Sequence, residues 1–404
     1  MTPLRILHVT PYFTDAWAYG GIPRVVDALA HALARRGHDV TVCTTDVCDA
    51  RTRSPRGDVF TRWRTIPAVD LPDGLHVRVF RNISNRLAYH LQFYSPLGFK
   101  RFMSEQASRF DLAHLHACRN LPGVIAASQL RRAGVPYVLT PNGTAPRIER
   151  RRLAKLAFDA FGGRRVFRDA TRLLAVTHVE ALQLHNLGAD HTRIRIVPNP
   201  IDLQEFEQPC EPGAFRRKRA LGAAPIVLFL GKLTPRKRLD VLVRAFHQLG
   251  DIDAQLVIAG NDMGAGGMAR GLVGRLGLDS RTTFVDLLRG RERLEALTDA
   301  AVLVYPSQDE IFGLAAVEAL LCATPVVVSD DSGCGEIVRG VGGGAVIPRG
   351  DVDACGRAIR AVLAAPAVAH AAAEDAGPRI RRAYGADNVA AGLEQVYSEL
   401  VSST

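Results

Sequence analysis

The sequence predicts an α/β protein made of two facing, doubly wound domains of the Rossmann-like kind. Short apolar runs alternate with helical patterns throughout the 404 residues, which is typical of parallel sheets covered by helices. The same pattern restarts near residue 225, after a segment rich in proline and acidic residues at 197–213. We therefore expect residues 1–198 and 199–387 to form one domain each, with a last helix within 388–404 crossing back to the first.

The first half opens with a buried strand, RILHVT at 5–10, and continues with an amphipathic helix at 22–36. Gly37 follows, where a glycine commonly ends the last helical turn. The other elements expected in this half are strands at 39–45, 75–80, 111–116, 135–140 and 172–177, and a helix at 121–133. The second half should hold strands at 225–231, 255–260, 282–288, 301–307 and 324–330, and a helix at 241–249.

Composition and charge narrow the class of protein. Hydrophobic residues make up 47% of the chain, which excludes a disordered protein, and the net charge of +10 favours anionic partners. The seven cysteines form no C-x-x-C pair, so neither a zinc ribbon nor a disulfide framework is indicated. The N-terminus is interpreted as a strand rather than a signal peptide, and no apolar run is long enough for a membrane span. These features predict a reduced, cytoplasmic protein.

Two glycines, Gly20 and Gly21, stand between the first expected strand and its helix. Glycines there let the backbone approach a ligand closely, and the helix N-terminus offers N–H groups to an anion. A tight strand-to-helix turn without a ligand is the alternative. No G-x-G-x-x-G run follows the first strand, which argues against a dinucleotide-dependent dehydrogenase.

Two lysines, Lys232 and Lys237, follow the first strand of the second half. Cations at a strand end, near a helix N-terminus, suit a diphosphate. The alternative is a solvated basic turn, because Arg236 and Arg238 lie in the same stretch and four cations cannot all contact one ligand.

The segment 307–330 contains two glutamates, Glu310 and Glu318, on either side of Gly313 and Leu314. The N–H groups of Gly313 and Leu314 would open a helix and can hold a phosphate. An acid on each side of that phosphate suits a ligand with hydroxyl groups at both ends of a diphosphate, which describes a nucleoside-diphosphate sugar. The alternative, two solvated carboxylates, fits Glu318 poorly because the expected helix around it is apolar.

At these motifs the sequence resembles the retaining glycosyltransferases of family 4, enzymes with two Rossmann-like domains known as the GT-B type. The resemblance covers essentially the whole chain. It rests on the Gly-Gly loop, on H-x-H at 114–116, on N-x-x-D at 199–202, on G-K-L-x-x-x-K at 231–237, and on E-x7-E followed by P-V-V-x-S-D.

The resemblance implies roles for individual residues. Glu310 corresponds to the acid that faces the donor sugar, and Glu318 to the acid that binds the ribose. The residues expected to bind the donor diphosphate are Gly20, Gly21, Lys232, Lys237, Gly313 and Leu314. The family more often has arginine at the position of Lys232, so the bidentate fork is lost here and the charge is kept. The resemblance also implies that neither a metal nor a cofactor is needed, because lysines and helix N-termini neutralise the leaving diphosphate.

Two histidines end the expected strand at 111–116. His116 would lie at its tip facing the cleft, and His114 points the same way because strand side chains alternate. The resemblance favours His116 as a catalytic residue beside the reacting sugar carbon, and the alternative is a structural histidine. Asn142 and Gly143 end the next strand and would border the donor sugar or the acceptor.

Residues 147–172 form a basic segment with nine basic and three acidic residues and an apolar stripe between them. Such a segment can lie on an anionic membrane surface or steer a phosphorylated acceptor. The alternative is a helix whose apolar stripe faces the core and whose basic face is solvated. Nucleic acid is not expected as a partner, because aromatic residues make up only 6% of the chain.

The sequence therefore predicts a metal-independent, retaining glycosyltransferase that moves a hexosyl group from a nucleoside-diphosphate sugar to a hydroxyl acceptor. The expected acceptor is a glycan or a lipid-linked sugar in cell-surface polysaccharide assembly, with the enzyme on the inner face of the membrane if the acceptor is lipid-linked. Three alternatives stay open: a natural-product glycosyltransferase, a nucleotide-sugar epimerase of the same fold, and a non-catalytic protein that binds sugar nucleotides.

Overall fold

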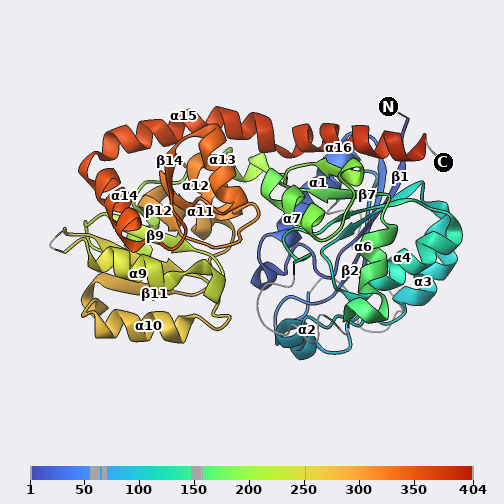
Figure 1. The fold of residues 1–404 in the computed structure, drawn as a ribbon, viewed down its shortest axis with the longest axis horizontal. Helices are drawn as coiled ribbons and strands as arrows, with labels where there is room; N and C mark the ends of the chain where they lie inside the picture. Colours follow the sequence, from blue (N-terminus) through green and yellow to red (C-terminus); the bar gives the residue numbers. More distant parts are fainter. Residues whose placement is uncertain are drawn as a thin grey trace. The chain divides into compact units, whose positions relative to one another are not determined.

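The computed structural model describes residues 2–54, 64–65, 71–146, 156, 158–250 and 252–402. The chain divides into two compact units (Figure 1). Unit 1 consists of Met1–Ile201 and Tyr384–Thr404, and unit 2 of Asp202–Ala383. The first boundary lies inside the proline-rich acidic segment 197–213, and the second returns the last helix to unit 1.

The sheet of unit 1 has the strand order β3-β4-β2-β1-β5-β6-β7-β8 in the described part of the chain. Neighbouring strands are parallel except β3 and β4. The bounds are β1 Arg5–Val9, β2 Asp39–Thr45, β3 Arg64–Thr65, β4 Leu75–Phe80, β5 Leu112–His116, β6 Tyr137–Thr140, β7 Arg172–Ala175 and β8 Ile194–Ile196. Because β1 is central, both of its faces are buried: Ile6 packs into one core cluster and Leu7 into the other.

Helices cover both faces of this sheet. The core cluster that contains Ile6 is completed by apolar side chains of α1 and α16, and the cluster that contains Leu7 by side chains of α3, α4 and α7. α1 ends as the sequence predicts, because Gly37 has a φ of +91° that favours glycine. The bounds are α1 Ile22–Arg35, α2 Asn85–Leu91, α3 Phe99–Gln106, α4 Leu121–Ala133, α6 Arg164–Asp169, α7 His178–Asn186 and α16 Ala386–Val401.

Unit 2 is a second doubly wound domain, with an all-parallel sheet in the order β11-β10-β9-β12-β13-β14. Its strands are β9 Ile226–Leu230, β10 Gln255–Ala259, β11 Thr282–Val285, β12 Ala300–Tyr305, β13 Val326–Ser329 and β14 Gly344–Ile347. Its helices are α8 Ala214–Lys218, α9 Leu239–His247, α10 Gly266–Arg275, α11 Gly290–Asp299, α12 Leu314–Leu321, α13 Gly333–Val341, α14 Val352–Ala364 and α15 Pro366–Tyr384. The predicted fold class of two Rossmann-like domains is confirmed.

Three strands were not expected from the sequence: β3, β8 and β14. β3 has two residues and β8 has three, too few for an alternating pattern. β14 begins at Gly344, where a Cβ would lie only 2.3 Å from the carbonyl oxygen of Val326, so only glycine fits there. This glycine shortens the apolar run from which the strand could have been predicted. Among the helices in the described residues, none combines the length and the apolar character that a membrane span requires.

Candidate active site

The carboxyl ends of β9 and β12 in unit 2 bring Lys237 and Glu310 into contact. The Lys237 ammonium donates hydrogen bonds to the Glu310 carboxylate and to the Tyr305 hydroxyl. Only 7% of the Lys237 side chain and 18% of the Glu310 side chain is exposed, so the alternative of a solvated basic turn is wrong for Lys237. Sequence reasoning named both residues but did not predict that they form one ion pair.

The electrostatics of this pair favour two charged partners. Burial works to raise the pKa of Glu310, but the positive charges of Lys237 and Arg236 outweigh it and bring the pKa to about 2. Burial lowers the pKa of Lys237, and the Glu310 carboxylate opposes that shift. Ser307 also donates to Glu310, over 3.2 Å. The charged ammonium of Lys237 is therefore buried at the carboxyl end of the sheet.

Gly313 opens α12 directly after this pair. Its φ of +75° favours glycine, and a Cβ at this position would lie 2.6 Å from the Cys334 sulfur and 3.7 Å from Cγ of Glu310. No side chain in the described part of the chain caps the helix, which begins at Leu314. Glycine is thus required here, and the start of α12 lies beside Glu310.

Glu318 lies one turn into α12, four residues after Leu314, and has a different partner. Its carboxylate accepts a hydrogen bond of 2.8 Å from Arg293 of α11, and Arg293 also pairs with Glu205. Glu318 is 1% exposed and Arg293 is 3% exposed, so the alternative of a solvated carboxylate is wrong. Arg293 was not singled out in the sequence, because it lies in a helix of mixed charge, GRERLEALTD, that gives no sign of a buried arginine.

The other predicted diphosphate residue of unit 2, Lys232, is partly buried just beyond the end of β9. Gly231 before it has a φ of +156°, and its carbonyl oxygen would be 1.9 Å from a Cβ on Gly260. The backbones after β9 and β10 therefore pack too closely for any residue but glycine at 260, which fixes the path of the chain leading to Lys232.

In unit 1, Gly20 and Gly21 form the turn that leads into α1. Gly20 has a φ of +95°, which favours glycine, whereas Gly21 has ordinary helical angles and acts as an N-cap without a side chain. The tight-turn interpretation thus accounts for Gly20, and it gives no reason for glycine at position 21.

Three histidines gather on adjacent strands. His116 is at the end of β5, and its Nε2 lies 2.9 Å from Nδ1 of His8 on β1. His114 is hydrogen-bonded through both ring nitrogens, to Tyr397 and to Thr140. All three rings are buried, and burial lowers their pKa values, that of His8 to about 3. The imidazoles are therefore neutral, and His8 is a partner of His116 that sequence reasoning missed.

The three histidines are close enough together to be considered as metal ligands. One ring nitrogen from each histidine lies within 4.8 Å of the others. Zinc, however, takes ligand nitrogens at about 2.0–2.1 Å, and a catalytic site needs three protein ligands. Among the ring nitrogens of these three histidines, only His8 Nε2 and His116 Nδ1 lack a hydrogen-bond partner in the described residues, since both nitrogens of His114 are engaged. As arranged, the cluster does not offer three available ligands.

Asn142 and Gly143 form the turn after β6, beside the end of β5. Asn142 has a φ of +51°, and both polar atoms of its side chain are buried without a hydrogen-bond partner in the described chain. The Gly143 N–H donates to Glu180 of α7 over 2.6 Å, and the Val176 N–H donates to the same carboxyl group over 2.9 Å. Glu180, which was not predicted, therefore holds the turn in place.

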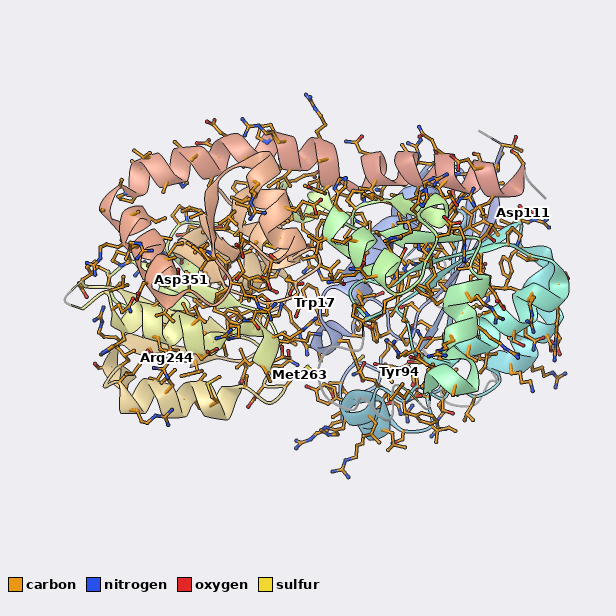
Figure 2. All side chains as sticks on the ribbon, in the orientation of Figure 1. Trp17, Tyr94, Asp111, Arg244, Met263 and Asp351 are labelled. Atoms are coloured by element: carbon orange, nitrogen blue, oxygen red, sulfur yellow. The ribbon has the colours of Figure 1, made fainter. Side chains whose placement is uncertain are left out.

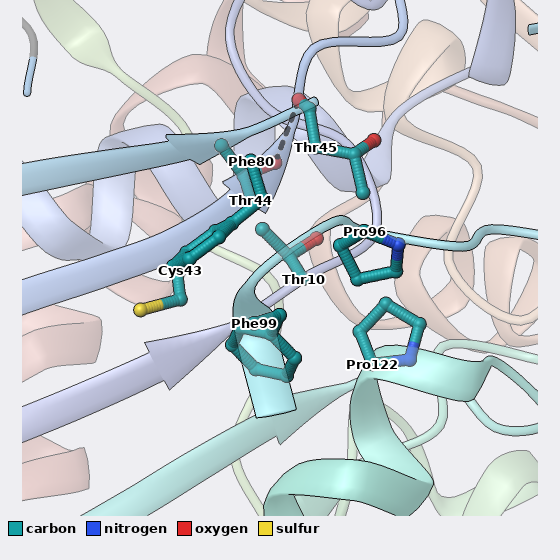
Figure 3. Close-up of a pocket in the computed structure, with 8 residues that line it drawn as sticks. All are labelled: Thr10, Cys43, Thr44, Thr45, Phe80, Pro96, Phe99 and Pro122. Carbon is teal, nitrogen blue, oxygen red and sulfur yellow. Dashed lines mark hydrogen bonds between the residues drawn. The ribbon is translucent and has the colours of Figure 1, made fainter. Parts of the chain in front are cut away.

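A small hollow in unit 1 lies near the carboxyl ends of β1, β2 and β4 (Figure 3). None of the predicted site residues lines it, and it has no room for a water molecule. It is lined by Thr10, Cys43, Thr44, Thr45, Phe80, Pro96, Phe99 and Pro122. We assign it no ligand.

The predicted membrane segment 147–172 is described only in its second part. Residues 147–155 and 157 lie outside the described residues, and they include most of the basic side chains on which the prediction rests. The prediction for this segment therefore stays a prediction.

Comparison with known proteins decides the family. A model described as "Glycosyl transferase 4-like domain" matches residues 20–200, and one described as "Glycosyl transferases group 1" matches residues 214–378. The D-inositol 3-phosphate glycosyltransferase of Mycolicibacterium gilvum is 32% identical over 354 residues, covering 83% of this chain and 75% of the relative. The chain belongs to the group 1 glycosyltransferases. The corresponding protein of Mycolicibacterium smegmatis is 31% identical over 378 residues, covering 87% of this chain and 81% of the relative.

Solved structures show the fold of this glycosyltransferase. Sucrose-phosphate synthase from Thermosynechococcus elongatus matches with a TM-score of 0.73 and 23% identity, covering 99% of each chain. Anabaena HepE, solved in complex with UDP and glucose, matches with a TM-score of 0.75 and 16% identity, covering 98% of this chain and 99% of that one. The fold is the GT-B type, and each family model falls within one of the two units.

Proposed function

We propose that this glycosyltransferase moves a hexosyl group from a nucleoside-diphosphate sugar to a hydroxyl acceptor, with retention of anomeric configuration. The observation that carries the proposal is the buried Lys237–Glu310 ion pair beside the start of α12. A buried ammonium and an uncapped helix N-terminus suit an anion with several oxygen acceptors. A diphosphate has that chemistry, and it is the leaving group of a nucleotide sugar.

In this proposal unit 2 binds the donor. Lys232, Lys237 and the N–H groups at Gly313 and Leu314 stabilise the charge that develops on the departing diphosphate. Glu310 faces the donor sugar, and a metal ion is not required, because the protein itself supplies the positive charge.

Glu318 is the proposed ribose partner. A carboxylate accepts hydrogen bonds from two vicinal hydroxyl groups, and the hydrogen bond that Arg293 donates orients Glu318. This role makes Arg293 a positioning residue of the donor site, which acts through Glu318 and does not itself contact the ligand.

The groups that unit 1 would contribute are Gly20, Gly21, His116, Asn142 and Gly143. The proposal for His116 is supported by its unpartnered Nδ1 and that for Asn142 by its unpartnered amide, since buried polar atoms without partners are costly unless a ligand or water completes them. Neutral imidazole and amide groups suit the hydroxyl groups of a sugar. The turn at Gly20 and Gly21 is proposed to approach the donor phosphates.

The names of the relatives guide the choice of substrates. The solved neighbours include proteins in complex with UDP, UDP-glucose and ADP, which supports a nucleoside diphosphate as the donor part. The relatives named D-inositol 3-phosphate glycosyltransferase support a phosphorylated polyol as one acceptor class. A glycan or lipid-linked sugar in cell-surface polysaccharide assembly, handled by a cytoplasmic enzyme, is the other.

A donor screen tests the proposal. Purified protein is incubated with uridine, guanosine and adenosine diphosphate sugars, and release of the nucleoside diphosphate is measured with and without acceptors of both classes. We expect slow hydrolysis of one donor, faster release with the correct acceptor, and a product with the donor's anomeric configuration. An epimerised free sugar would identify a nucleotide-sugar epimerase, and binding without turnover would identify a non-catalytic binding protein. Either outcome would overturn the proposal.

A further inference from the structure

Unit 1 exposes a group of large apolar side chains around α2. Among the described residues, five of the exposed large apolar side chains fall within residues 83–97, and the others lie elsewhere in the chain. The five, which we call the α2 face, are Ile83 (59% exposed), Leu87 (42%), Leu91 (51%), Phe93 (48%) and Leu97 (48%). Single exposed apolar residues need no explanation, but a cluster of this kind marks an interaction surface.

The local structure arranges four of these side chains as two neighbouring pairs. Leu87 and Leu91 are one helical turn apart, and the Ser84 hydroxyl caps the helix by accepting from the Leu87 N–H. Around the helix the chain returns on itself: the Ile83 N–H donates to Ser95 over 3.1 Å, and the Leu97 N–H donates to Arg81 over 2.9 Å. Ile83 and Leu97 are therefore brought to the same end of α2.

The opposite side of α2 is packed into unit 1. Ala88 and Tyr94 are buried in a cluster with Tyr12 and Tyr19, and the rings of Tyr12 and Tyr94 are 5.7 Å apart. Figures 1 and 2 show α2 at the lower edge of unit 1, with Tyr94 just above it. The core thus uses only the inner side of this segment, and the α2 face is not required for its packing.

Charge indicates what covers the α2 face. The chain has no acidic residue between Asp73 and Glu105, while Arg81, Arg86 and Lys100 in this stretch are exposed. Apolar side chains flanked by cations fit the interface of a bilayer that contains anionic lipids: the apolar groups enter the acyl boundary, and the cations meet the lipid phosphates. A second copy of the chain would bring the same cations together, which disfavours self-association through this face.

We propose that the α2 face docks on an anionic lipid bilayer. The cluster of tyrosines connects this face to the proposed donor turn, because Tyr19 directly precedes Gly20 and its ring is 5.8 Å from that of Tyr89 in α2. Docking would therefore bring a lipid-linked acceptor to unit 1. This last step rests on the proposed function, whereas the docking itself does not.

Vesicle co-sedimentation tests the docking. The probes are phosphatidylcholine vesicles and phosphatidylcholine vesicles containing phosphatidylglycerol, each at low and high salt. One variant is Leu87→Gln/Leu91→Gln, one is Arg86→Gln/Lys100→Gln, and the matched control is Leu182→Gln, an exposed leucine (61%) of α7 in the same unit. All these side chains are exposed, and thermal unfolding checks that each variant remains folded.

The wild type and the control should bind the anionic vesicles, and high salt should weaken that binding. The leucine variant should bind at least about tenfold more weakly, because two apolar side chains no longer enter the bilayer. The charge variant should lose the preference for anionic lipid.

Three results would overturn docking: no binding by the wild type, equal binding to both kinds of vesicle, or a leucine variant that binds like the control. Dimers in sedimentation velocity that the leucine variant abolishes would also overturn it, in favour of a second copy as the occupant. Donor hydrolysis is measured on the same samples without vesicles. Its absence in the wild type would reject the proposed function while leaving the vesicle result to stand.

Discussion

Replacing Lys237 by methionine separates a structural role of the buried ion pair from a catalytic one. The ammonium is buried against the Glu310 carboxylate and the Tyr305 hydroxyl. Methionine keeps most of the volume but removes the charge. Glu310 is then left as a buried carboxylate without its main partner, which is a strongly destabilising arrangement.

The magnitude follows from the pKa of Glu310, which falls from an ordinary 4.5 to about 2. A lowered carboxyl pKa contributes stability that is fully present above pH 4.5 and is lost as pH falls toward 2. The difference is worth about 3 kcal/mol at pH 7. Lys237→Met should therefore lower the free energy of unfolding by about 3 kcal/mol at neutral pH and by much less near pH 3.

Urea unfolding at pH 7 and pH 3 measures the structural part, and turnover at saturating donor measures the catalytic part. The double variant Lys237→Met/Glu310→Gln removes both charges and should recover most of the stability. Its turnover should stay about two to three orders of magnitude below wild type, because the leaving diphosphate has lost a charged contact. Arg217→Met is the matched control, since Arg217 pairs with Glu211 in unit 2 and both side chains are exposed, 58% and 76%. It should cost at most about 1 kcal/mol and leave turnover unchanged.

Two results would refute this reasoning. If Lys237→Met unfolds like wild type at pH 7, the buried pair does not stabilise the protein as the pKa of Glu310 implies. If the double variant turns over within a few-fold of wild type, Lys237 does not contact the leaving group, and the pair is structural only.

Further predictions concern other groups of the proposed site. Glu318→Ala should weaken binding of the nucleoside diphosphate by about 2–3 kcal/mol in calorimetry. An unchanged affinity in this variant would remove Glu318 from the site, and so would an Arg293→Met variant that is less stable but binds the nucleoside diphosphate as wild type does. Lys232→Arg should be tolerated in turnover assays, since arginine keeps the charge. Activity should survive EDTA, and loss that manganese or magnesium restores would contradict the metal-free mechanism. Burial raises the pKa of Glu180 to about 7, so its contribution to stability is present below pH 4.5 and lost as pH rises through 7. The free energy of unfolding should thus fall by about 3 kcal/mol between pH 4.5 and 8 on account of this group, and Glu180→Gln should flatten that slope.

Much of the fold could be predicted, because the strands that make a doubly wound sheet are buried on both faces. Such strands appear in the sequence as short, nearly continuous apolar runs, and runs like PIVLFLG coincide with the strands found, here β9 Ile226–Leu230. Strands at the sheet edges are shorter and bury fewer apolar side chains, so their apolar pattern in the sequence is weaker. β8, with the sequence IRI, is an example.

The partners of the site residues were harder to predict, because they come from distant parts of the chain. Arg293 looks like any arginine in a charged helix until α11 packs against α12 and buries it. His8 did carry a signal: in a doubly wound sheet the first strand is central, so a histidine in RILHVT lies next to the H-x-H strand. Glu180 stands three residues after Thr177, a spacing that predicts a capping box, yet its carboxyl group binds the turn at Gly143 instead.

The two units present different chemistry at the same position in their sheets, the carboxyl ends of parallel strands. In unit 1, burial keeps His8, His114 and His116 neutral, so the group at the end of β5 can exchange hydrogen bonds with hydroxyl groups but cannot neutralise an anion. In unit 2, the carboxylate of Glu310 keeps Lys237 charged in spite of burial. The group at the end of β9 can therefore interact with an anion. Helix N-termini lie at the same sheet edge and add to the attraction for an anion. The difference in protonation, rather than any single motif, supports the proposal that Lys237 of unit 2 meets the diphosphate and that the histidines of unit 1 meet hydroxyl groups.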